Sequence, residues 1–314
     1  MIRTVAARLA TLVVLVWVVS LAVFALVLLI PGDPTTTLLG DNATPEQVTA
    51  LRTSLGLDDP LLMRYWRWLS GALQGDLGTS MLSSYPVTQA IGDRIGVTVS
   101  LVVSALVLSV VLGLVIGVLA AVRQGGWFDR LTLLGSSIGI AMPNFWLGLV
   151  LVTFFGAELG LFPTSGYARP GDGVGDWVAH LVLPVVTLAA GGVAEIARQA
   201  RASLVDTLRL DFVRTAAAKG LSPLSIVGKH ALRTAMIPVI TVMGLQVSRL
   251  FGMSVLVEAV FALPGIGSLM VASVFDRDIP MIQGTVLLAT VVVVVVNLLV
   301  DLSYGWLNPK AALT

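Results

Sequence analysis

The side chains best suited to bind a solute or an ion are a few polar groups inside or beside long apolar stretches. Arg249 lies in the middle of the apolar run Ala235–Val257, Gln246 precedes it by three residues, and Glu258 follows the run. Burying a charge within a membrane-length run costs free energy, so such a residue marks a functional site by default. The spacing predicts that Gln246 and Arg249 share a helix face. Two interpretations of Arg249 stay open: a pore residue that contacts the solute, or a structural pair with Glu258 or a second chain.

Two more polar groups lie beside or within apolar runs. Glu195 lies near the end of the run Trp177–Arg198 and precedes Arg198 by three residues, which predicts a local ion pair at the membrane surface. Asn144 follows Pro143 in the third apolar run. Where a proline breaks a membrane helix, a polar side chain there can line a path for solute.

The sequence offers no catalytic or metal centre of a familiar kind. It has no cysteine, and its two histidines, His180 and His230, are far apart. A phosphate-binding loop requires G-x-x-x-x-G-K-[ST]. Gly228-Lys229 does not fit, because Pro223 occupies the first glycine position and His230 follows the lysine. We therefore expect no catalytic residue, no metal and no cofactor in this chain, and hence no enzyme.

A basic stretch between residues 199 and 234 is the strongest local signal. Asp211–Lys219 reads as a helix, Gly220 fits the position after a helix end, and Ser222-Pro223 fits the cap and first residue of a second helix. Apolar residues then recur at helical spacing, namely Leu224, Val227, Ala231 and Leu232. A solvated basic loop explains the charge but not this pattern, which indicates a helix–glycine–helix elbow that docks a partner.

Composition shows what surrounds these residues. Charged residues make up 12% of the 314 residues and hydrophobic residues 56%, against about 25% charged in a soluble domain. A net charge of +1 gives no electrostatic reason to bind nucleic acid. Since about 20 apolar residues cross a bilayer, six spans are predicted: Leu9–Ile30, Val97–Val122, Leu131–Ala157, Trp177–Arg198, Ala235–Val257 and Met281–Val300.

The distribution of lysine and arginine predicts the orientation. With both termini in the cytoplasm, twelve basic residues fall on the inner side and six on the outer side, although the outer loops are longer. The outer segment 31–94 is expected to be helical. Thr44-Pro45-Glu46-Gln47 reads as a capping box that starts a helix ending near Gly56, and Asp59-Pro60 starts another that runs to about Gln74.

Small residues at four-residue spacing predict where the spans pack closely. Ser109, Gly113, Gly117 and Ala121 form such a face in the second span, and Gly135 and Gly139 form one in the third. This pattern is common in proteins with several spans and carries no information about the solute.

The elbow resembles the "EAA" loop of type I ABC-importer permeases, and "RTAAAKGL" (214–221) is closest to the form in peptide and nickel permeases. Four further stretches are similar to dipeptide and oligopeptide permease B subunits. They are "LGLDDPLLMRYWRWLSGALQGDLGTS" (55–80), "AMPNFWLGL" (141–149), "VEAVFALPGIGSL" (257–269) and "VNLLVDLSYGWLNP" (296–309). These stretches follow one another in the family's order, and the resemblance covers nearly the whole chain.

The resemblance implies an all-α integral membrane protein with the type I permease fold. Its parts would be a tail and first span (1–30), an extracytoplasmic helical segment (31–94), a five-helix core (95–309) with the coupling loop at 199–234, and a tail (310–314). The coupling-loop residues would be Arg214, Ala217, Lys219, Gly220, Leu221, Ser222, Pro223 and Leu224. Asn144, Gln246 and Arg249 would line the path, and Glu258, Pro264 and Gly265 would form an outer gate or structural element.

The resemblance also implies partners in the bacterial cytoplasmic membrane. These would be a second, C-type permease, one or two ABC ATPase subunits that bind ATP and Mg²⁺, an extracellular solute-binding protein, and lipid. The function would be import of short peptides by alternating access. A nickel or other small-solute permease is the nearest alternative. A secondary transporter would require acidic residues or histidines at mid-membrane, and a scaffold would have no use for the elbow or for Arg249.

Overall fold

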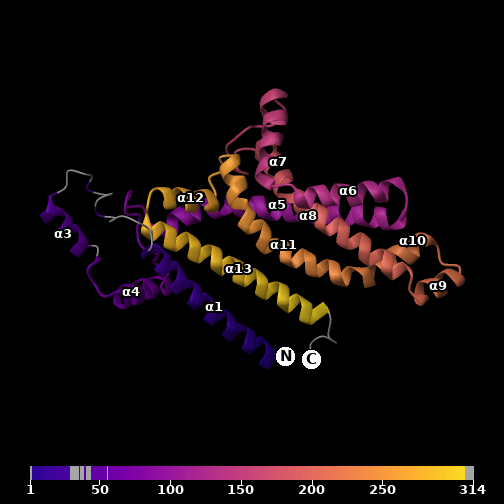
Figure 1. The fold of residues 1–314 in the computed structure, drawn as a ribbon, viewed down its shortest axis with the longest axis horizontal. Coiled ribbons are helices and arrows are strands. Elements are labelled where there is room, and N and C mark those ends of the chain that lie inside the picture. The colour runs from indigo at the N-terminus through magenta and orange to yellow at the C-terminus, as the bar shows by residue number, and fades with distance from the viewer. Residues whose placement is uncertain (1, 29–34, 36–38, 40–43, 55, 308–314) are drawn as a thin grey trace. The chain divides into compact units, whose positions relative to one another are not determined.

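The computed structural model describes residues 2–28, 35, 39, 44–54 and 56–307, and these residues form helices joined by turns and loops (Figure 1). Within them the sole strand-like pairing is an isolated bridge between Thr79 and Pro86. The chain divides into two compact units, which we describe separately. One comprises residues 1–96 and 265–295, and the other comprises 97–264 and 296–314.

In the first unit, helix α4 (Leu61–Leu73) packs against α1 (Ile2–Leu28). Tyr65 is buried, its hydroxyl lies 2.8 Å from Ser20 Oγ, and its ring meets Phe24 edge to face. This unit also contains the start of α5 (Val87–Val122), α12 (Ile266–Phe275) and most of α13 (Ile279–Leu307). Val87, Ala90 and Ile91 of α5 pack there against Ile266 and Met281.

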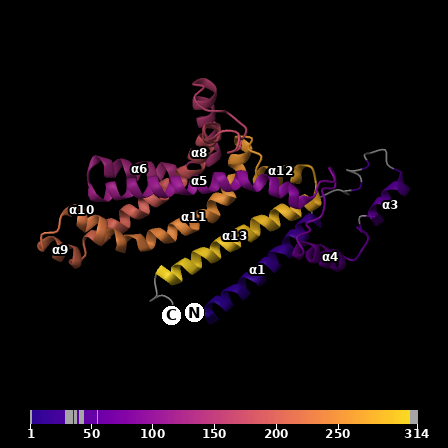
Figure 2. The ribbon, with the colours of Figure 1, turned by 180° about the vertical axis from the view of Figure 1, so that it is seen from behind.

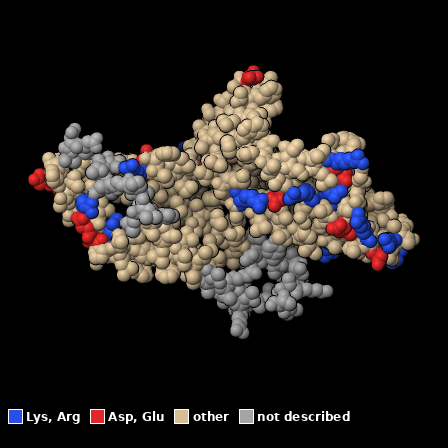
Figure 3. All heavy atoms as spheres, viewed as in Figure 1, with Lys and Arg blue, Asp and Glu red and all other residues tan. Residues whose placement is uncertain are grey.

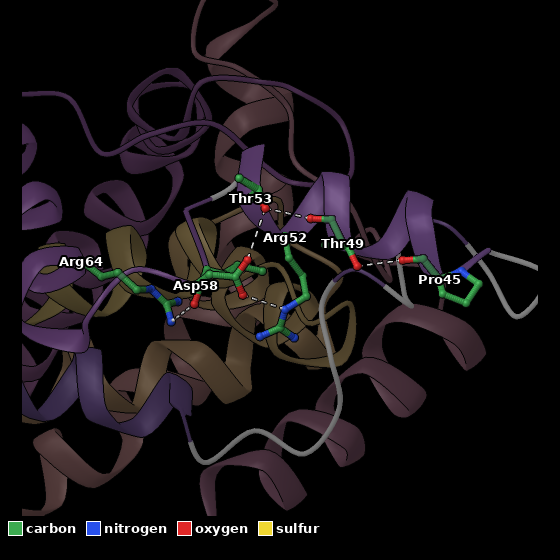
Figure 4. A network of polar contacts seen from close by, with 7 residues as sticks. Pro45, Thr49, Arg52, Thr53, Asp58 and Arg64 are labelled. Carbon is green, nitrogen blue, oxygen red and sulfur yellow. Dashed lines mark hydrogen bonds and ion pairs between the residues drawn. The ribbon is translucent and has the colours of Figure 1, made fainter.

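Helix α3 (Pro45–Ser54) begins as its capping box predicts. Thr44 N donates to Gln47 Oε1 at 3.0 Å, and Gln47 N donates to Thr44 Oγ1 at 3.3 Å. The helix is followed by Gly56 at φ +62, as expected. Figure 4 shows the polar contacts that hold the turn after α3, where Asp58 accepts hydrogen bonds from Arg52 Nε and Thr53 Oγ1.

The second unit is built on α8 (Val174–Leu208), which packs against α6 (Trp127–Ala141), α7 (Asn144–Leu151) and α11 (Leu232–Val260). Figure 2, viewed from behind, shows α6 running alongside α8 in this unit. Its main core joins residues of α5, α8 and α11, including Leu101, Leu188, Leu250 and Phe261. These helices position the polar candidate side chains described below, and the elbow lies on the chain between α8 and α11.

Glycines let these helices approach closely, as the small-residue spacing predicts. A Cβ on Gly117 of α5 would lie 2.6 Å from the Ala197 carbonyl oxygen of α8, and one on Gly113 would lie 2.7 Å from Ile196 Cβ. Gly139 of α6 likewise approaches Ala194 of α8. Gly135 differs, because a Cβ there would meet nothing within 4 Å. Of the two glycines predicted to pack closely in the third span, only Gly139 does so.

Among the described residues, four helices are long and apolar enough to cross a membrane: Val87–Val122, Val174–Leu208, Pro223–Val260 and Ile279–Leu299. A fifth span results if α6 and the helices Asn144–Glu158 count as one; they are bent by 102° at the break. The third predicted span is therefore not straight, because Pro143 starts a new helix in a different direction. In α1 the apolar stretch Leu12–Ala25 is shorter.

Two span boundaries differ from the predictions by more than two helical turns. Helix α5 starts at Val87 instead of Val97, so part of the predicted segment 31–94 belongs to it. Helix α8 continues past Arg198 to Leu208. The expected turn Pro31-Gly32-Asp33-Pro34 and the tail 310–314 lie outside the described residues.

Candidate coupling elbow and polar path

The elbow forms at the predicted residues. Helix α9 (Asp211–Ala218) ends one residue before Lys219, and Gly220 follows at φ +80, a left-handed conformation that favours glycine. Ser222 then caps α10 (Pro223–Ser225), because its Oγ accepts a hydrogen bond from Ser225 N at 3.3 Å. Pro223 occupies the first helical position. The glycine thus follows the end of one helix, and the cap starts the next.

The second arm of the elbow differs from the regular α-helix that was predicted. After α10, residues Ile226–Ala231 form a π-helix, η2, which leads without a break into α11. Ile226 and Ala231 are buried, and Val227 packs beside Ala231, Leu204 and Ala235. Leu224 points the other way and is 85% exposed. The apolar residues predicted to share one face are thus divided between an inner contact and an outer surface.

The exposed surface of the elbow carries both apolar and basic side chains. Its exposed apolar side chains are Leu210, Phe212, Leu221 and Leu224. Arg214, Lys219, Lys229 and His230 are also exposed. Burial of such apolar side chains stabilises an interface, whereas exposed charges at a rim add mainly orientation. Sequence reasoning missed Phe212 and Leu210, which no helical spacing singled out.

Glu195, Gln246 and Arg249 form one polar cluster between α8 and α11. Glu195 Oε2 accepts a hydrogen bond from Gln246 Nε2 at 2.7 Å and another from Arg249 Nη1. The predicted local pair of Glu195 with Arg198 is wrong, because the carboxylate turns toward α11. The expectation that Gln246 and Arg249 share a face is confirmed, since both reach the same oxygen.

The three side chains of this cluster differ in how far they are exposed. Gln246 is buried, the Glu195 side chain is 27% exposed, and the Arg249 side chain is 53% exposed. Gln246 therefore lies behind the carboxylate, and Arg249 lies at the surface of this unit. The Gln246 amide on the buried side and the Arg249 guanidinium on the exposed side hold the Glu195 carboxylate in place.

Glu258 does not pair with Arg249, so that structural alternative is also wrong. Glu258 is fully buried, and its Oε1 accepts a hydrogen bond from Thr98 Oγ1 of α5 at 2.7 Å. Its backbone oxygen accepts from Leu263 N in the turn after α11. In that turn Ala262 has φ +49, and Pro264 leads to Gly265, the residue that precedes α12. The geometry fits a structural role for Glu258 at this turn.

Asn144 lies at the bend between α6 and α7 but is buried, and its Nδ2 lies 3.7 Å from Met253 Sδ of α11. A different polar pair, missed by sequence reasoning, lies between α6 and α8. Asp129 is buried and accepts two hydrogen bonds from Arg201. Nothing in the local sequence links these two residues, which are 72 positions apart. Among the described residues no group of histidine, aspartate and glutamate side chains is arranged to hold a metal ion.

Two family models match almost the whole chain. Residues 113–313 match "Binding-protein-dependent transport system inner membrane component", and residues 1–102 match "Binding-prot-dependent transport system membrane comp, N-term". The chain is 43% identical over 309 residues to the glutathione transport system permease protein GsiC of Escherichia coli, covering 98% of both chains. It is 40% identical over 303 residues to the probable peptide ABC transporter permease protein y4tP of Sinorhizobium fredii, covering 96% of this chain and 97% of that one.

Solved structures show a similar fold at lower identity. One chain of the MetNI methionine ABC transporter in an inward-facing conformation matches with a TM-score of 0.57 and 19% identity. The match covers 70% of the present chain and 97% of the other. At this identity the likeness concerns the fold alone.

Proposed function

The chain belongs to the family of binding-protein-dependent transport system inner membrane components, and on that premise we propose that it forms half of the pore of an ATP-driven importer for short peptides. It is a multi-pass protein of the bacterial inner membrane and a transport component. The observation that carries the peptide assignment is the match over nearly the full length to permeases named for glutathione and for peptides. These names favour a peptide over nickel as the solute.

The elbow supports coupling to an ATPase. Leu221 and Leu224 expose apolar surface beside the Gly220 turn, and basic side chains are exposed on the same elbow. An ATPase subunit would bury the apolar side chains, so that its ATP-driven movement is transmitted through α10 and η2 into α11. The coupling residues are Arg214, Ala217, Lys219, Gly220, Leu221, Ser222, Pro223 and Leu224. ATP and Mg²⁺ belong to the partner, because this sequence has no phosphate-binding loop.

The proposed topology has six spans with both termini in the cytoplasm. Helix α1, the bent pair that starts with α6, and the four long apolar helices together make six. The excess of basic residues in the segments that include the elbow supports its cytoplasmic side. The solute path would run beside Arg249 and Gln246, with Asn144 behind the bend, and Glu258, Pro264 and Gly265 would stabilise the outer end.

Purification of the tagged chain from its native membrane, followed by mass spectrometry, tests this function. We expect a second, homologous permease and one or two ABC ATPases to remain bound, and an extracellular solute-binding protein to be recovered after mild cross-linking. Uptake of a labelled tripeptide should then require both ATP and the binding protein. Recovery of the chain alone or as a homomer, with ATP-independent uptake, would instead favour a secondary transporter.

A further inference from the structure

The second unit contains two arginine–carboxylate pairs that differ in exposure and in how many hydrogen bonds they form. The difference indicates a structural role for one pair and a binding role for the other. The pair Arg201–Asp129 is closed, because both carboxylate oxygens are engaged and the side chains are 19% and 3% exposed. The pair Arg249–Glu195 is open, because one carboxylate oxygen receives both donors and the arginine is 53% exposed. Arginine has five N–H donors in a planar fork. In the described contacts Arg249 uses only one of its nitrogens, Nη1.

The open pair continues as a charged stripe along α8. Residues 195, 198, 202, 206 and 209 follow one another at helical spacing and are exposed or half-buried. They are Glu195, Arg198, Ala202, Asp206 and Arg209. Figure 3 shows a row of basic side chains, broken by an acidic one, that crosses the surface over α8 and α11. The stripe starts at Glu195, which bonds to Arg249 of α11, and reaches Arg209, the residue that follows α8.

This stripe cannot face lipid over its whole length. Arg249 lies 11 residues before the end of α11, about 16 Å along the helix axis at 1.5 Å per residue. Ionisable residues at such depth face a bundle interior or a water-filled cavity. Because these side chains are exposed within their own unit, they line either the solute path or an interface beside it.

We propose that Arg249, held against Glu195 and flanked by Arg198, is a carboxylate-binding site of the translocation path that receives a carboxylate of the peptide in transit. The proposal rests on the peptide-import function above. The three side chains carry a net single positive charge, which favours an anion. Charge-assisted hydrogen bonds from a guanidinium to a carboxylate are also stronger than those to a neutral amide.

Glu195 gives the site its reversibility. Gln246 is buried and bonds to the same Glu195 oxygen as Arg249, so the glutamate keeps its position when Arg249 swings to a solute. The solute carboxylate therefore competes with Glu195 for the guanidinium. A site of this kind binds its ligand weakly, and a transport path requires weak binding so that the solute can leave.

The test measures uptake into proteoliposomes containing the whole importer and its binding protein. Three labelled peptides are compared: trialanine, its C-terminal amide, and an amidated tripeptide with one glutamate side chain. The quantity of interest is the uptake of each carboxylate peptide divided by that of the trialanine amide. Because the same binding protein serves every variant, a change in this ratio arises in the permease.

Substitutions of Arg249 and of Glu195 are expected to change the uptake ratio in opposite directions. Arg249→Gln should lower the ratio by about tenfold, the size expected for one charge-assisted hydrogen bond. Glu195→Gln should raise it, because the competing carboxylate is lost while the amide can still bond to Gln246. Arg249→Lys should keep part of the preference, since it retains the charge without the fork. The peptide whose ratio responds identifies the carboxylate as C-terminal or side-chain.

The controls separate this proposal from a structural role and from the transport function itself. Arg123→Gln, an exposed arginine outside the stripe, should leave the ratio unchanged. Co-purification of the ATPase verifies that each variant assembles. Equal loss of all three peptides in both Arg249→Gln and Glu195→Gln, or an unchanged ratio in both, overturns the carboxylate site. If the wild-type importer takes up none of the peptides, the proposed function fails first.

Discussion

Asp129 and Arg201 form a two-point ion pair between α6 and α8. Arg201 Nε donates to Asp129 Oδ1 at 2.7 Å, and Arg201 Nη2 donates to Oδ2 at 2.8 Å. Asp129 Oδ2 also accepts from Gly125 N at 2.9 Å, in the turn that joins α5 to α6. One carboxylate therefore fixes a turn and two helices, close to the point where α8 approaches the elbow.

Asp129→Ala should destabilise the protein strongly, because it leaves the largely buried Arg201 without its counter-charge. Breaking a buried pair typically costs about 3–5 kcal/mol. The measurement is the thermal unfolding midpoint of the detergent-purified importer. The double variant Asp129→Leu with Arg201→Met removes both charges and should recover most of that loss. A double variant no more stable than Asp129→Ala would contradict this account.

Gly117→Leu should separate α5 from α8. A Cβ at this position would already lie 2.6 Å from a backbone oxygen and 2.8 Å from Ala200 Cβ, so the helices must move apart. Overpacking of this kind costs about 1–3 kcal/mol. Thermal unfolding of the purified complex provides the readout. Gly135→Leu is the matched control in α6, where the space is open, and it should unfold near the wild-type temperature.

Gly220→Pro should abolish uptake while the chain still inserts in the membrane. Its φ of +80 is not accessible to proline, whose ring holds φ near −65°, so the turn between α9 and α10 must change. Peptide uptake and membrane content of the chain are measured together. Gly228→Ala in η2, where a Cβ meets nothing within 4 Å and φ is helical, is the control. Normal uptake by the Gly220→Pro variant would argue against a coupling role.

Leu224→Asp should weaken binding of the ATPase subunit, with little effect on the folding of this chain. The side chain is 85% exposed in the isolated chain, so the change removes no internal packing. At the centre of an interface such a change typically costs more than about 2 kcal/mol of binding free energy. The amount of ATPase retained during purification is the readout. Leu73→Asp, a similarly exposed leucine of α4, should retain as much ATPase as the wild type.

Asp278→Ala should loosen the first unit at the turn before α5. The buried Asp278 accepts hydrogen bonds from Ser80 Oγ and from Met81 N, so it ties the turn before α5 to the turn before α13. We expect added chymotrypsin to cleave faster after Leu82, an exposed leucine of this turn, in right-side-out vesicles. Ser83→Ala, in the same turn, is the comparison variant, and a cleavage rate equal to wild type in Asp278→Ala would refute the prediction.

The elbow could be predicted because its determinants are local. A glycine with positive φ, a serine that caps three residues ahead and a proline at the first helical position each act within one turn. The π-helix Ile226–Ala231 could not be predicted in the same way. Its geometry accompanies the packing of Val227 and Ala231 against Leu204 and Ala235, which are not neighbours along the chain.

The sequence by itself determined the apolar runs, the helix caps, the elbow and the glycine faces, because these depend on residues within a few positions of one another. Only the tertiary structure decided which charges meet. Glu195 has Arg198 as a neighbour on its own helix, yet it pairs with Arg249, 54 positions away. A buried charge is stabilised by the opposite charge nearest in space, and that distance is set by how α8 and α11 pack.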